Sequence, residues 1–94
     1  MSKGELKIKN ILDENNIKYI QEYEPLDLKG KRFDFALLNS DDFIYRLIEF
    51  DGIQHFENWY LDKKDSLKQR QERDLIKNEY CFNHNIQLVR IPFW

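Results

Sequence analysis

The 94-residue sequence predicts one small α+β domain, spanning residues 1–94, whose elements follow the order α-β-β-β-α-β. Three observations support this fold class. Helix-like patterns occupy residues 3–14 and the stretch from about residue 65 to residue 83. Strand-like stretches rich in β-branched and aromatic residues lie between these helices, and one more follows the second. Turn residues over 39–42 favour an antiparallel hairpin between the second and third strands. We therefore expect a mixed sheet flanked by helices.

The composition narrows the class of protein. The chain is 41% hydrophobic and 15% aromatic, which is enough for a core, while 34% charged residues are typical of a soluble protein. No apolar run approaches membrane-spanning length and no signal peptide is recognisable, so we expect a cytoplasmic protein without a membrane partner. Cys81 is the single cysteine, which excludes an internal disulfide and a cysteine-cluster zinc site. The net charge of −2 excludes a generally basic nucleic-acid binder.

The first helix and strand are predicted from capping and periodicity. Ser2 and Glu5 have the spacing of a capping box. Apolar residues then recur at roughly helical spacing, at Leu6, Ile8, Ile11 and Leu12. Asn15 and Asn16 suit a helix stop, residues 17–23 suit a strand, and residues 25–31 suit a loop.

The predicted hairpin, with strands over 32–38 and 44–51, brings three carboxylates together. Glu49 and Asp51 are two residues apart on one strand and therefore point to the same face. Asp34 on the neighbouring strand falls opposite Leu47 in one register, and opposite Glu49 if the register shifts by two residues. Both registers put the three carboxylates on one face. The other face is apolar and should be core, with Phe33, Phe35, Leu37, Ile48 and Phe50.

Three neighbouring carboxylates repel one another, so without a cation at least one should have a raised pKa. This arrangement favours a divalent cation site. The alternative is a solvated strand face with no ligand.

The second half of the chain offers further candidates. Residues 52–62 should be irregular, with aromatic residues that either cap the core or contact a nucleic-acid strand: Phe56, Trp59 and Tyr60. In the second helix, Asp74 shares a heptad position with Leu67 and Cys81 and so lies on or beside the stripe that should face the sheet. It is expected to pair with Arg70 or Lys77, to reach the acidic site, or to orient His55. Residues 86–91 should form the last strand.

Positive charge gathers around the start of the second helix. The basic residues there are Lys63, Lys64, Lys68, Arg70, Arg73 and Lys77. They could line a DNA approach or belong to an ordinary solvated helix.

Several segments together resemble a known family. These are Ser2-Lys3-Gly4-Glu5-Leu6, Arg32-Phe33-Asp34-Phe35 and Ile48-Glu49-Phe50-Asp51-Gly52-Ile53-Gln54-His55, followed by Glu72-Arg73-Asp74 on a helix and the strand over 86–92. In order and context they resemble the restriction-endonuclease-like, or PD-(D/E)XK, nuclease superfamily. Within it, the chain resembles the very-short-patch-repair endonucleases and their phage-type homing endonuclease relatives, whose signature is Glu-Asp-x-His-Asp.

The resemblance implies a DNA endonuclease that depends on Mg²⁺ or Mn²⁺ and hydrolyses phosphodiester bonds. It assigns the signature to Glu5, Asp34, His55 and Asp74. Asp34 would be the main metal ligand, with Glu49 and Asp51 as further ligands. His55 would transfer a proton, and Glu5 and Asp74 would orient water and His55.

The chain also departs from the family. Asp51 stands where the superfamily has a lysine, which favours the branch that uses histidine. The repair enzymes' structural zinc has no counterpart, so no zinc is expected and mismatch repair does not transfer. The alternative function is a nuclease-fold domain without catalysis that binds nucleic acid or a partner protein. We expect a monomer or homodimer, either as a minimal phage-type enzyme or as one domain of a longer protein with a separate DNA-recognition segment.

Overall fold

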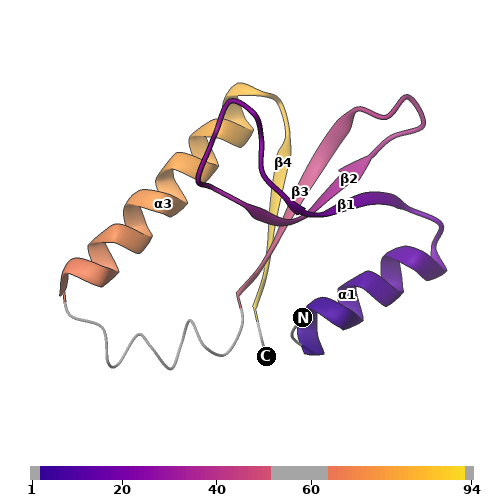
Figure 1. Cartoon of the computed structure of the whole chain (residues 1–94), viewed down its shortest axis with the longest axis horizontal. Coiled ribbons are helices and arrows are strands. Elements are labelled where there is room, and N and C mark those ends of the chain that lie inside the picture. Colours follow the sequence, from indigo (N-terminus) through magenta and orange to yellow (C-terminus); the bar gives the residue numbers. More distant parts are fainter. Residues whose placement is uncertain (1–2, 52–63, 93–94) are drawn as a thin grey trace.

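The computed structural model describes residues 3–51 and 64–92 (Figure 1). With the labels of Figure 1, its elements are α1 (Lys3–Glu14), β1 (Lys18–Tyr23), β2 (Phe33–Leu38), β3 (Ile44–Asp51), α3 (Lys64–Asn83) and β4 (Gln87–Pro92). The predicted order α-β-β-β-α-β is confirmed, and the predicted boundaries agree closely. No helix in these two ranges is long and apolar enough to cross a membrane.

The four strands form one mixed sheet in the order β1-β2-β3-β4. The first three strands are antiparallel neighbours. β4 instead pairs in parallel with β3, because α3 returns the chain to the end of the sheet where β3 begins. The small α+β domain with a mixed sheet and two helices is therefore as predicted.

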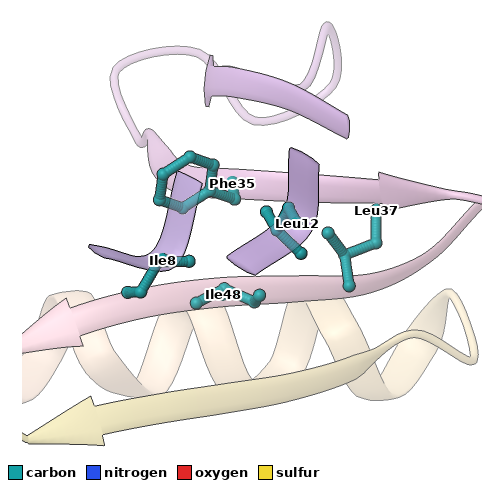
Figure 2. Close-up of a cluster of buried hydrophobic side chains, with 5 residues drawn as sticks. All are labelled: Ile8, Leu12, Phe35, Leu37 and Ile48. Carbon is teal, nitrogen blue, oxygen red and sulfur yellow. The ribbon is translucent and has the colours of Figure 1, made fainter. Parts of the chain in front are cut away.

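Each helix covers a different face of the sheet. Adjacent residues of β3 face opposite sides of the sheet, because successive side chains of a strand point in opposite directions. Ile48 packs with Ile8 and Leu12 of α1, as Figure 2 shows, whereas Leu47 packs in a second cluster with Cys81 of α3. The sheet is thus buried on both sides, and its charged residues on the α3 side lie between two layers.

One expected core residue lies on the other side of the sheet. Phe33 was predicted to share the face of Phe35, but it belongs to the α3-side cluster, with its ring centroid 6.3 Å from that of Tyr80. Strict alternation holds only along a regular strand. At this end of β2 the regular pairing with β3 ends at Phe35, and the next residue, Asp34, accepts a hydrogen bond from the Phe50 amide through its side chain.

The hairpin register depends on a bulge in β3. Asn39 Oδ1 accepts hydrogen bonds from the amides of Asp41 and Phe43 at 2.9 and 3.0 Å, which holds the turn. Leu38 then pairs with Ile44, but Leu37 pairs with Arg46, so Tyr45 is the extra residue. The bulge selects the shifted register of the two predicted.

The start of α1 packs against the sheet through a glycine. A methyl group at Gly4 would overlap the ring of Phe50 on β3. Gly4 therefore permits a close approach that places the next residue, Glu5, beside the end of β3. Of the predicted apolar stripe of this helix, Ile8 and Leu12 are buried, whereas Leu6 and Ile11 are exposed.

Candidate functional site

Asp34 and Glu49 meet where β2 and β3 leave the hairpin core. Phe35 pairs with Ile48 at this end of the hairpin, and Asp34 and Glu49 are the next residues along the two strands. Both side chains are half-buried. The amide of Phe50 donates a hydrogen bond of 2.6 Å to Asp34 Oδ2, which fixes this carboxylate beside β3. Asp34 Oδ1 has no hydrogen-bond partner within residues 3–51 and 64–92.

Glu49 forms an ion pair between the sheet and α3. Lys77 Nζ lies 2.9 Å from Glu49 Oε1, and the side chains are only 12% and 15% exposed. Burial raises the pKa of Glu49 above its ordinary value, while the hydrogen bond and charge of Lys77 lower it. The Asp34 charge raises this pKa further, and Arg90, the parallel register partner of Glu49, lowers it.

Glu5 is the third carboxyl group in this region. Burial is the main cause that raises the pKa of Glu5, and the negative charge of Asp34 is the next. Asp34 therefore acts electrostatically on Glu5 of α1 and on Glu49 of β3. The pKa of Glu49 is raised, but burial is the main cause and the Asp34 charge a smaller one, so the predicted repulsion among Asp34, Glu49 and Asp51 stays a prediction.

Lys77 turns toward the sheet. Its ammonium donates to Glu49 and, at 2.7 Å, to the carbonyl oxygen of Arg32, and it lies 5.0 Å from the centre of the Phe33 ring. The charge pattern of the sequence grouped this lysine with the predicted DNA contacts. Its spacing of four residues before Cys81 is the signal that places it on the inward face of α3. DNA contact by Lys77 stays a prediction.

Asp74 pairs with Arg90, a residue outside the predicted site. Arg90 Nη2 of β4 lies 3.2 Å from Asp74 Oδ1, whereas Lys77 pairs with Glu49. The side chain of Arg70, the other predicted partner, is not among those that the structure describes. The residue Arg90 interrupts the apolar alternation of the last strand, and this was the available signal. Arg90 is also the register partner of Glu49, so it lies between Asp74 of α3 and Glu49 of β3.

Other candidates fall elsewhere. His55, Lys63 and the three aromatic residues of 52–62 lie outside the described residues. Asp51 ends β3 and Lys64 begins α3, but their side chains, like that of Arg70, are not described. Lys68 and Arg73 are exposed on α3. His84, expected at the surface, is partly exposed and lies 3.2 Å from Asp27.

The donor set suits a hard cation with few protein ligands. Across the described residues, no three or more His, Cys, Asp or Glu side chains are close enough to hold a metal ion. Asp34 and Glu49 offer two carboxylates, and Mg²⁺ commonly binds one or two carboxylates while it keeps several waters. The residues present therefore fit Mg²⁺, with Asp51 as the adjoining candidate.

In comparisons with known proteins, no family model matches the chain, and neither does any curated protein or solved structure. The PD-(D/E)XK resemblance stays a prediction from the sequence.

Proposed function

We propose that this domain is a metal-dependent DNA endonuclease, of the kind found as the catalytic domain of homing or phage-type endonucleases. One observation carries the proposal: Asp34 and Glu49 are half-buried carboxylates on neighbouring strands, and Asp34 Oδ2 accepts a hydrogen bond from the amide of the residue that follows Glu49. Burying carboxylates costs free energy unless they are paired or bind a ligand. A bound divalent cation would offset this cost in free energy.

Each residue of the site has a role in this proposal. Asp34 and Glu49, with Asp51 as a further candidate, would hold Mg²⁺. When bound, the metal would lower the pKa of water and offset charge on the scissile phosphate. Lys77 and Arg90 counteract burial and favour the ionised form of Glu49. The Phe50 amide orients Asp34, and Glu5 lies close enough for the Asp34 charge to raise its pKa, after burial as the main cause.

The roles of His55 and Asp74 follow from the resemblance. His55 would carry a proton to or from the reacting groups, as its near-neutral pKa in the free amino acid allows. Asp74 would orient it. Because Arg90 binds Asp74, the arginine becomes a positioning residue in the same network.

A second function has its own supporting observation. The Lys77 ammonium already balances the negative charge of Glu49, so the burial of this carboxylate does not require a metal ion. This favours the alternative of a nuclease-fold domain that binds nucleic acid or a protein without cleaving DNA.

Cleavage of a mixed-sequence plasmid separates the two functions. With Mg²⁺ or Mn²⁺ the wild-type chain should nick or linearise the plasmid, and EDTA should prevent it. Asp34→Asn should abolish cleavage. Lys18→Gln, which also removes one charge but at an exposed position of β1, is the control and should not affect cleavage. His55→Ala should lose ~10²–10⁴-fold in rate while keeping DNA affinity. DNA binding by the wild type with no metal-dependent cleavage would favour the binding domain.

A further inference from the structure

A groove runs between α3 and the loop that joins β1 to β2. It has a volume of about 260 Å³ and is lined by Lys31 of the loop and by Gln69, Glu72, Arg73 and Ile76 of α3. The four helical residues have the spacing of one helix face. The groove thus has two walls that come from distant parts of the chain.

The loop wall is fastened to α3 at several points. Lys77 Nζ donates to the carbonyl oxygen of Arg32, next to Lys31, at 2.7 Å. Tyr80 Oη donates to Asp27 at 3.0 Å, and His84 Nε2 lies 3.2 Å from the other oxygen of Asp27. Pro25, at the start of the loop, is fully buried. A groove with fixed walls binds a ligand without the cost of ordering a loop.

The charge of the groove favours an anion. Lys31 and Arg73 line it from opposite walls, and neither side chain has an ion-pair or hydrogen-bond partner in the part of the chain that the structure describes. Gln69 adds an amide donor, and Arg73 adds the planar guanidinium that suits phosphate oxygens. Glu72 is the one lining group that opposes an anion. Lys29, Arg32 and Lys68 are exposed nearby in sequence and add positive charge.

The groove lies next to the candidate site. Arg73 is one helical turn before Lys77, which binds Glu49. Lys31 directly precedes Arg32, whose carbonyl accepts from the same lysine. A single ammonium therefore connects the groove walls with the Asp34–Glu49 pair.

We propose that the Lys31–Arg73 groove binds a backbone phosphate of the DNA strand whose neighbouring phosphates reach the Asp34–Glu49 carboxylates. This inference rests on the proposed function, because it names the strand that the carboxylates act on. The two cations hold one phosphate, and so position the strand without reading its sequence.

The salt dependence of DNA binding tests the groove. Binding of the full chain to a fluorescein-labelled mixed-sequence duplex is measured by anisotropy, in EDTA, at several NaCl concentrations. For Lys31→Gln/Arg73→Gln, the slope of log K against log salt should fall by about 0.9, the value for one phosphate contact. Either single variant should account for most of this change. Glu72→Gln should tighten binding. The control Lys7→Gln/Lys18→Gln removes two positive charges from α1 and β1 and should keep the wild-type slope.

Cleavage measured on the same variants separates this inference from the proposed function. If the wild type cleaves DNA but the double variant keeps the wild-type slope, the groove is overturned and the endonuclease stands. If the double variant loses about 0.9 in slope while the wild type never cleaves, the groove stands and the endonuclease is overturned. Absence of DNA binding by the wild type overturns both.

Discussion

At the scale of single residues, Asp34 combines a hydrogen-bond acceptor with a negative charge. Asp34→Asn keeps an acceptor for the Phe50 amide but removes the charge that acts on Glu5 and Glu49. We expect the metal-free variant to be more stable than the wild type in urea unfolding with EDTA. Asp34→Ala leaves a partly buried amide unpaired and should cost about 1–3 kcal/mol.

The same variant has a second readout. Without the Asp34 charge, the pKa values of Glu5 and Glu49 should both fall, which NMR titration of the side-chain carboxyl carbons measures. If neither pKa changes in Asp34→Asn, the three carboxyl groups do not share a site.

The Lys77–Glu49 pair makes stability depend on pH. Because the folded state raises the pKa of Glu49 above 4.5, folding favours its protonated form. This group's contribution to the free energy of unfolding is therefore largest at low pH and declines as pH rises from about 4.5 through the raised folded pKa. Lys77→Met should raise that pKa further and extend the decline to higher pH. It should cost about 1.5–3 kcal/mol at neutral pH, from the lost charged hydrogen bond.

A double-mutant cycle isolates this pair. Glu49→Gln/Lys77→Met removes both charges, so it should recover much of the stability that Lys77→Met alone loses. Equal destabilisation by the single and the double variant would mean that Glu49 does not depend on Lys77.

At the scale of elements, the contact between α1 and the sheet opposes helix propensity. Alanine is favoured over glycine by about 1 kcal/mol inside a helix. At position 4 the added methyl group would overlap the Phe50 ring, so Gly4→Ala should instead destabilise the fold by about 1–3 kcal/mol in chemical unfolding. Lys7→Ala, at an exposed position of the same helix, should change stability by less than about 0.5 kcal/mol. A Gly4→Ala variant more stable than the wild type would contradict this packing.

At the scale of the whole molecule, a cation that binds only the folded chain must stabilise it. At a concentration of ~100 times the dissociation constant, Mg²⁺ or Mn²⁺ should add about 2.7 kcal/mol. For a domain of this size, each kcal/mol raises Tm by about 4–8 °C. The shift should vanish in Asp34→Asn, and NaCl of equal ionic strength should not reproduce it. An unchanged Tm of the wild type at millimolar metal would exclude the shared cation site.

The sequence by itself determined the order and bounds of the elements. Local signals are sufficient for these, as the hairpin shows: strand-forming residues flank the turn residues from Asn39 to Asp42, and the strand over 44–51 begins and ends where predicted. The same alternation placed Asp34 and Glu49 together, because a two-residue period leaves few choices of face. The apolar stripe of α1 was predicted only in part, since Leu6 and Ile11 are exposed.

Only the tertiary structure decided the register and the charge partners. The residue pattern allowed Asp34 to fall opposite either Leu47 or Glu49, and the bulge at Tyr45 gives the second of these registers. Phe33 lies on the α3 side of the sheet, beyond the last pair that β2 makes with β3, so the alternation of the sequence did not predict its face. Lys77 forms an ion pair with Glu49, and Arg90 forms one with Asp74. Sequence spacing does not distinguish these partners from the many other charged residues. These pairs join residues far apart in the chain, so their choice depends on how α3 lies across the sheet, which no local pattern specifies.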